Sequence, residues 1–385
     1  MVHTKAKIKQ IIISLHTLIK TFQKKRFVIY KRSDITNIKL LIQDQISTSQ
    51  TLPSIVNLAI DNASFSIILP PRWIRIYENV KILPHYSFIF KDNIVEIPKF
   101  NSKITCLKSR VAEHIFSIDA EKLILIDSNR EEVHSDCAIS LAGHYSEHFG
   151  HFLLEYLERL NPLENVGIKQ IDVILNEDVD RNILDLILSM ELSYKINILL
   201  LKQNQYVVCK KYYHVDPHAI VCDGAFYASI TDKLYYPSFR NFYKSFSAPK
   251  KIQRGRKLFL TRSNKRNISN IREIEEYFAE HGYEIVENCH TMTINEKKTL
   301  FSDASYVVGP GGSAFFNCIW CPVDVHILCF FNYEIAYDNV LQNMLSNQAK
   351  IYHLAGKETK YEFYNSQYDI PLEEVVEFSK ELGFL

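Results

Sequence analysis

Short apolar runs alternate with longer amphipathic segments from Leu141 onward. The run QIDVIL (170–175) is typical of a buried strand, and so is KINILLL (195–201). Between them, DRNILDLILSMEL (180–192) repeats its apolar positions at the spacing of an amphipathic helix. Because strands that alternate with helices pair in parallel under a helical cover, this pattern predicts an α/β fold.

The alternation resumes after a polar, basic stretch, SFSAPKKIQRGRK (245–257), which we interpret as a linker. Two α/β halves joined in this way should face a cleft, with ligand at the carboxyl ends of the strands. In the second half we expect strands at 257–261, 283–287, 305–308 and 324–330, and helices at 271–282, 295–304 and 313–320.

The predicted organisation has four parts. A basic arm covers residues 1–33, an N-terminal domain residues 34–245, and a C-terminal domain residues 246–360. Residues 361–385 contain the helical pattern PLEEVVEFSKEL, which we expect to pack back on the N-terminal domain. Up to Lys122 the N-terminal domain shows only short strand patterns punctuated by prolines, and these assign it no role.

The charge of the chain is unevenly distributed. Lys and Arg number 45 and Asp and Glu 44, a net charge of +1. Nine basic and no acidic residues precede Asp34, so the rest of the chain holds 36 basic against 44 acidic side chains, a net charge of −8. A basic arm on an acidic body indicates an anionic neighbour, for which we take a membrane surface and not nucleic acid.

The apolar run of the arm, IIISLHTLI (11–19), is too short to span a bilayer. A helix flanked by Lys and Arg suits an anionic lipid surface, and a first helix packed on the body is the equal alternative. The eight cysteines have no disulfide-framework spacing, which predicts reduced thiols and a cytoplasmic protein. We interpret the pair Cys318 and Cys321 as core residues because no second pair or nearby His completes a zinc site.

A glycine-rich turn, Gly309-Pro310-Gly311-Gly312, separates a strand from the helix that Ser313 opens. Backbone N–H groups at such a turn, together with the positive end of the helix dipole, suit a phosphate. The turn also fits the dinucleotide pattern G-x-G-x-x-A, and Glu334 follows the next strand, where an acidic residue would meet a ribose. A tight turn without ligand is the alternative.

A row of histidines marks the first half. His144, His148, His151 and Glu155 are spaced by four, three and four residues, and Arg159 follows one turn later. On a helix these side chains share one face, although Gly150 interrupts the pattern. Three interpretations remain open: a metal site, a general base oriented by Glu155, and a polar seam between domains.

The third element is the stretch LFLTRSNKRNISN (258–270). Arg262, Lys265 and Arg266 follow directly on a strand, at the end where ligands gather. Arg matches phosphate oxygens with a fork of donors and stays charged at every relevant pH. The stretch is therefore either a solvated charged loop or, with the glycine turn, a diphosphate clamp.

In this order and spacing, the three elements resemble glycosyltransferase family 61. FGHFLLEYLER is similar to the family's aromatic-x-His-Trp-Leu-x-Glu helix, and LTRSNKRNISN to its Ser-Arg strand end. GPGGSAFFNCIWCP is similar to its Gly-Pro-His-Gly-Ala turn with a following Asn and Cys-Pro. Gly311 stands in place of the family's His, and Cys329 in place of a Glu that often closes the next strand. The matching positions are His151, Glu155, Arg159, Arg262, Arg266, Asn270, Gly309, Pro310, Gly312, Asn317, Cys321 and Pro322.

The resemblance implies two Rossmann-like halves in a GT-B-like arrangement and an inverting transfer of sugar without a metal. The donor would be a nucleotide sugar, a UDP-sugar first, and the acceptor a glycan or lipid-linked chain of a capsule or other surface polysaccharide. His151 would be the base with Glu155 orienting it, and His148 its alternative. His144 and Arg159 would face the acceptor. The donor would be held by Arg262, Arg266, Gly309, Gly311, Gly312, Ser313, Asn317 and Glu334.

No further cofactor or metal is implied. The acidic stretch EDVD (177–180) resembles a metal motif of other transferases, but we interpret it as a helix cap. Two alternatives remain: an oxidoreductase that binds an NAD-type dinucleotide on the glycine turn, and a glycan-binding relative that has lost catalysis.

Overall fold

The computed structural model describes 15 segments of the chain. They are residues 26–51, 55–58, 64–83, 88–96, 115–118, 122–127, 130–143, 146–216, 219–221, 233–248, 255–262, 268–332, 340–345, 348–360 and 367–385. Most of the basic arm lies outside them, as do His144, Lys265, Arg266 and Glu334.

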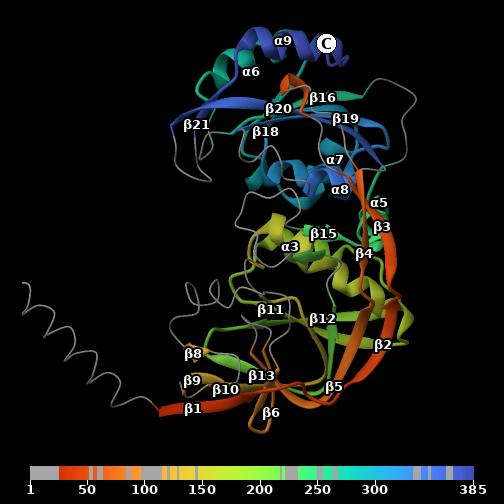
Figure 1. The fold of residues 1–385 in the computed structure, drawn as a ribbon, viewed down its shortest axis with the longest axis vertical. Coiled ribbons are helices and arrows are strands. Elements are labelled where there is room, and N and C mark those ends of the chain that lie inside the picture. Colours follow the sequence, from red (N-terminus) through yellow and green to blue (C-terminus); the bar gives the residue numbers. More distant parts are fainter. Residues whose placement is uncertain are drawn as a thin grey trace, which may run out of the picture.

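The C-terminal half is built on a six-stranded sheet with the order β17-β16-β18-β19-β20-β21. The first five strands are parallel and β21 is antiparallel. Helices α6 and α9 cover one face, and α7, α8 and η5 cover the other (Figure 1). The strands are β16 (Arg256–Leu260), β17 (Glu284–Val286), β18 (Ala304–Pro310), β19 (Val325–Asn332), β20 (Ala349–Lys360) and β21 (Gln367–Asp369). The helices are α6 (Ile271–Glu280), η4 (Cys289–Thr291), α7 (Ile294–Phe301), η5 (Ser313–Trp320), α8 (Val340–Leu345) and α9 (Leu372–Glu381).

In chain order the parallel strands are arranged 2-1-3-4-5, which is a doubly wound sheet. The α/β prediction is therefore confirmed for this half, in which β16 to β19 lie where we expected strands, whereas β20 and β21 were not predicted. The chain reverses its winding between β16 and β18, and ligands of such sheets bind in the crevice at that point. Arg262 follows β16, and the glycine turn comprises the last two residues of β18 and the two that follow, so both lie at this switch point.

The N-terminal half has a different sheet. Its order is β12-β11-β10-β13-β5-β6-β7-β1-β9-β8, with β2 paired to β5, and only β12, β11, β10 and β13 form a continuous parallel group. The expectation of two Rossmann-like halves is not confirmed, because most pairings of the strands before residue 130 are antiparallel. The strands are β1 (Arg26–Arg32), β2 (Ile38–Gln43), β5 (Arg72–Leu83), β6 (Phe88–Lys91), β7 (Ile94–Glu96), β8 (Ile115–Ile118), β9 (Lys122–Asp127), β10 (Glu131–Ser140), β11 (Gln170–Asn176), β12 (Lys195–Leu201) and β13 (Gln205–Val215).

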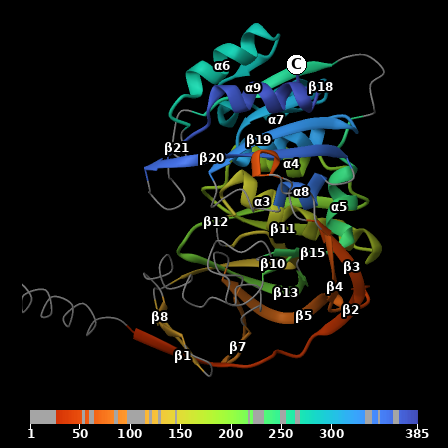
Figure 2. The same cartoon turned by 45° about the horizontal axis from the view of Figure 1, so that its top comes forward.

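A layer of helices lies between the two sheets (Figures 1 and 2). From the N-terminal half it contains α3 (Phe149–Glu155), the 3-10 helix η3 (Leu157–Asn165), α4 (Arg181–Leu188) and α5 (Pro237–Lys244). The side chain of Asp180 accepts a hydrogen bond from the N–H of Asn182 at 2.7 Å, so its expected role as the cap of α4 is confirmed. Apolar side chains from both halves form one core in this layer, among them Phe152, Leu153, Phe315 and Trp320.

An N-terminal hairpin also connects the halves. It consists of β3 (Ile46–Thr51) and β4 (Ser64–Leu69) and runs along one side of the molecule from the large sheet towards the C-terminal sheet (Figure 2). Ile55 pairs with His353 on β20, and the 3-10 helix η1 (Val56–Leu58) follows. Within η1, the side-chain amide of Asn57 donates to the carbonyl of Ala355 at 2.7 Å, and its oxygen accepts from the N–H of Ala355 at 2.9 Å. The described part of the chain also contains the pair β14 (Ala219–Val221) and β15 (Lys233–Tyr235).

The terminal helix α9 packs beside α6 on the C-terminal sheet, where Val375 joins a core with Phe259 and Phe278. We expected it against the N-terminal domain, which it meets through a 3.0 Å hydrogen bond from Asn57 to Glu374. The four-part domain boundaries stay a prediction. Among the described residues, no helix has the length and apolar character that crossing a membrane requires.

Candidate functional site

The glycine turn and Arg262 meet at the carboxyl ends of β16 and β18. Nη1 of Arg262 donates to the carbonyl of Gly311 at 3.0 Å, and the guanidinium fills the space that a side chain at Gly312 would need. The two elements are adjacent because parallel neighbours end at the same edge of a sheet. The sequence therefore placed this cation correctly beside the turn.

Each glycine of the turn contacts other parts of the protein. Gly309 has φ +147°, and a Cβ there would overlap the carbonyl of Leu260; a Cβ at Gly311 would overlap the ring of Phe331. These two glycines are therefore required by the packing of the protein itself, whereas we expected all of them to clear space for a ligand. Only at Gly312 is the close neighbour a cation.

The turn leads into η5, whose first residue, Ser313, is exposed. The N–H of Gly311 is used by the carbonyl of Phe330 at 2.8 Å. The first N–H groups of a helix lack acceptors within the helix, and η5 begins directly after Gly312, against which the Arg262 guanidinium packs. Arg262 and the start of η5 together make this corner electropositive.

Gly150 brings the histidine segment against this corner. A Cβ at Gly150 would lie 2.8 Å from the ring of Phe316 and 3.2 Å from Cβ of Ser313, so α3 and η5 cross in close contact here. Its place in the pattern had indicated an interruption of the helix. In the structure Gly150 lies in the first turn of α3, and the helix continues beyond it. The contact joins one helix from each half of the molecule.

His151 follows Gly150 and pairs with Glu155. Its Nδ1 lies 2.9 Å from Oε1 of Glu155, and the two side chains are 41% and 34% exposed, so solvent or a substrate can reach both. Nε of Arg159 donates to the carbonyl of Glu155 at 2.9 Å, which fixes the end of α3. A histidine that donates from Nδ1 to a carboxylate carries its lone pair on Nε2, as a general base must.

The histidine stripe does not extend over a single long helix. His148 precedes α3 as its N-cap, and its Nε2 lies 3.6 Å from Oε1 of Glu147. Arg159 belongs to η3 and is buried. Burial lowers the pKa of the Arg159 guanidinium, which stacks on Tyr156 at 4.5 Å. Arg159 thus supports Glu155 from inside the domain. Within the segments described, no group of three or more His, Cys, Asp or Glu is arranged to hold a metal ion.

The predicted donor residue Asn317 and the departure from the family pattern at Cys329 are both buried. Asn317 donates to the carbonyl of Ala314 at 2.9 Å and to Sγ of Cys289 at 3.4 Å, so its amide faces the core beneath the turn. Cys329 lies in β19 opposite Gly309, and burial raises its thiol pKa well above the ordinary value. Cys318 and Cys321 are also buried free thiols, in agreement with their interpretation as core residues.

Lys297 of α7 was not predicted as part of the site. The residue is only 3% exposed, and its ammonium lies 4.8 Å from the centre of the ring of Phe149, the residue that precedes Gly150. Burial lowers its pKa. The spacing of Ile294, Lys297 and Phe301, all buried, shows that helical periodicity alone could have marked this lysine as inward-facing.

Residues 149–328 match the family model described as Glycosyltransferase 61. That part of the chain belongs to glycosyltransferase family 61. The match begins at the first residue of α3 and ends inside β19, so it contains the His151–Glu155 pair, Arg262 and the glycine turn. No curated protein matches the chain.

Membership of glycosyltransferase family 61 indicates a glycosyltransferase, with a nucleotide-sugar donor and an acceptor as its substrates. It does not support the two alternatives, a dinucleotide oxidoreductase and a non-catalytic relative. The two elements that the structure brings together, the His151–Glu155 pair and the corner around Arg262, both fall within the family 61 region.

Proposed function

We propose that this protein is an inverting glycosyltransferase that uses His151 as its base and needs no metal ion. The observation that carries the proposal is the crossing of α3 and η5 at Gly150. It sets a histidine–carboxylate pair of one half beside the electropositive corner of the other. A transferase needs its base and the groups that stabilise the leaving diphosphate on either side of the same sugar ring.

In the proposed reaction, Nε2 of His151 takes the proton of an acceptor hydroxyl. The hydroxyl oxygen forms a bond to the anomeric carbon as the bond from that carbon to the diphosphate oxygen breaks, and the electron pair leaves with the diphosphate. Glu155 stabilises the imidazolium through the 2.9 Å contact at Nδ1. Arg262 and the first N–H groups of η5 neutralise the departing charge.

The donor of this proposal is a UDP-sugar and the acceptor a glycan or lipid-linked chain of a surface polysaccharide such as a capsule. Arg266 and Glu334 are proposed donor contacts, and His144 a proposed acceptor contact. We further propose a cytoplasmic enzyme whose basic residues 1–33 attach it to an anionic membrane surface. The two halves would close on the substrates in the manner of GT-B enzymes.

The test compares His151→Ala and Arg262→Ala in a panel of nucleotide sugars, with a chelator present. His151→Ala should retain UDP binding in a thermal-shift assay and lose transfer by at least about a hundredfold, the size of a general-base contribution. Arg262→Ala should weaken both. The exposed His281→Ala is the matched control and should change neither. Full transfer by His151→Ala would rule out the proposed base, and loss of transfer with chelator would rule out a metal-free reaction.

A further inference from the structure

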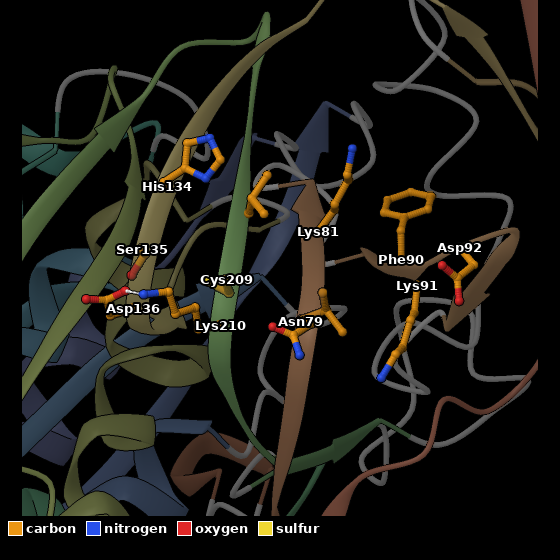
Figure 3. A pocket seen from close by; sticks show the side chains of 12 residues that line it. Asn79, Lys81, Phe90, Lys91, Asp92, His134, Ser135, Asp136, Cys209 and Lys210 are labelled. Atoms are coloured by element: carbon orange, nitrogen blue, oxygen red, sulfur yellow. Dashed lines mark ion pairs between the residues drawn. The ribbon is translucent and has the colours of Figure 1, made fainter.

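The large sheet carries a hollow that the proposed reaction does not use. It measures about 560 Å³ and is lined by β6, β5, β13 and β10 and by the turn after β6 (Figure 3). Two further hollows, of about 510 and 600 Å³, share Asp136 with it and extend it to β11 and the loop before that strand. Because neighbouring strands lie about 4.8 Å apart, this transverse groove runs roughly 19 Å from β6 to β11.

The lining of the transverse groove combines apolar surface with polar side chains and is rich in lysine. Amide, hydroxyl and imidazole groups come from Asn79, Gln170, Ser135 and His134. The charged lining residues are Lys81, Lys91, Lys169, Lys210 and Lys211, against Asp92, Asp136 and Asp172.

This excess of lysine is local. The chain beyond residue 33 has a net charge of −8, so a lysine-rich groove on it favours an anionic ligand. Lys210 pairs with Asp136 at 2.7 Å and Lys81 with Glu132 at 3.3 Å, but all four side chains are exposed. Exposed pairs contribute little, about 0–1 kcal/mol each, so a ligand can replace the partner. Amides and carboxylates among the amines suit a ligand that also carries hydroxyl groups.

Asn79 provides a second, independent observation. It lies inside β5, between the ladder pairs Glu78–Lys211 and Val80–Cys209, yet has φ +52°. Asp92, also in the left-handed region, is accounted for by the tight turn between β6 and β7. No turn accounts for Asn79. A strained residue of this kind costs about 1–3 kcal/mol and is typical of ligand sites, and its side chain lines the groove (Figure 3).

We propose that the transverse groove binds the acceptor chain away from the transfer site, and that this chain is an acidic glycan. The inference rests on the proposed function, since it takes a glycan as the acceptor. The helix layer separates the groove's sheet from the C-terminal half (Figure 1). The groove would therefore hold a part of the acceptor glycan that is distant from the end at which transfer takes place. Holding it there raises the effective concentration of the chain's end at the crevice.

The experiment measures binding of polygalacturonate oligomers to the full chain by calorimetry, with dextran oligomers, oligo-dT and anionic lipid vesicles as the other probes. The double variant K91E/K210E should weaken polygalacturonate binding about tenfold, equal to 1.4 kcal/mol, and added salt should weaken it further. The exposed Lys244→Glu on α5 makes half of this charge change at a place outside the groove and should alter binding less than about twofold.

Asn79→Gly separates binding from stability. Glycine adopts φ +52° without strain, so the variant should unfold at the same or higher urea concentration while polygalacturonate binding weakens. Unchanged binding in Asn79→Gly and K91E/K210E would overturn the proposal, as would equal binding of dextran. Groove-dependent binding of oligo-dT or vesicles in preference to polygalacturonate would overturn it in favour of another polyanion.

The same variants distinguish this inference from the proposed reaction. UDP-sugar hydrolysis should be unchanged in K91E/K210E, because the groove residues do not line the crevice. If hydrolysis is intact and the groove variants bind polygalacturonate normally, the groove inference fails alone. If UDP neither binds nor is released in any variant, the proposed transferase reaction fails instead.

Discussion

The contact between α3 and η5 can be tested by adding one methyl group, with Gly150→Ala. The new Cβ would lie 2.8 Å from the Phe316 ring, whereas carbon atoms in contact are about 3.5–4.0 Å apart. The two helices must therefore separate by roughly 0.7–1.2 Å, unless the ring moves. Overpacking of this kind costs about 1–3 kcal/mol, and alanine regains about 0.8–1.0 kcal/mol of helix propensity. The net loss of about 0–2 kcal/mol is too small to unfold a domain.

The loss of activity should be much larger than the loss of stability. A displacement of about 1 Å between reacting groups can reduce the rate about a hundredfold, so kcat/KM for transfer should fall by roughly ten- to a hundredfold. The melting temperature should fall by only a few degrees. A second change, Phe316→Ala, removes the ring that the methyl group meets, and the double variant should recover most of the activity. Wild-type kcat/KM in Gly150→Ala, or no recovery in the double variant, would refute the role of this contact.

Two further predictions concern stability. Lys297→Met should raise the free energy of unfolding at pH 7 by about 1 kcal/mol or more, because it removes a buried charge. Burial lowers the folded-state pKa of Lys297, so the wild type gains stability as pH rises from that pKa towards about 10.5, its ordinary value. The difference between the two proteins in urea unfolding should then shrink, and a constant difference would contradict this cause. Asn57→Ala removes three hydrogen bonds of 2.7, 2.9 and 3.0 Å, so it should cost about 1–3 kcal/mol by urea unfolding. Asn197→Ala, which removes one exposed hydrogen bond of 2.8 Å, should cost less than about 0.5 kcal/mol. Equal losses of unfolding free energy in the two variants would show that the bonds of Asn57 do not hold the two halves together.

The sequence was most informative where local pattern and sheet geometry agree. Apolar runs that alternate with amphipathic helices predicted each parallel strand from β16 to β19, and the common edge of those strands placed Arg262 beside the glycine turn. The mixed sheet of the N-terminal half could not be derived in this way. In that sheet the chain pairs β5 with β13, more than 120 residues apart, through contacts that no local pattern encodes.

The crossing at Gly150 was unpredictable for the same reason. Gly150 interrupts a helical pattern in the sequence, and nothing local shows that the missing side chain makes room for Phe316. The buried position of Lys297 is a different case. Its place on the apolar stripe of α7 agrees with the helical periodicity. Because lysine is almost always solvent-exposed, the sequence does not by itself indicate that Lys297 is buried.

The departure at Gly311 from the family's usual histidine also has a physical explanation in the fold. The ring of Phe331, at the end of the adjacent strand β19, occupies the space that a side chain at Gly311 would fill. Phe331 is 9% exposed, and the centre of its ring lies 5.2 Å from that of the tilted His353 ring of β20. A bulky residue at 331 and the absence of a side chain at 311 are therefore parts of one arrangement, in which the corner is filled from the neighbouring strand. Since Arg262 still bonds to the Gly311 carbonyl, the cation that we propose for the leaving group keeps its support without the histidine.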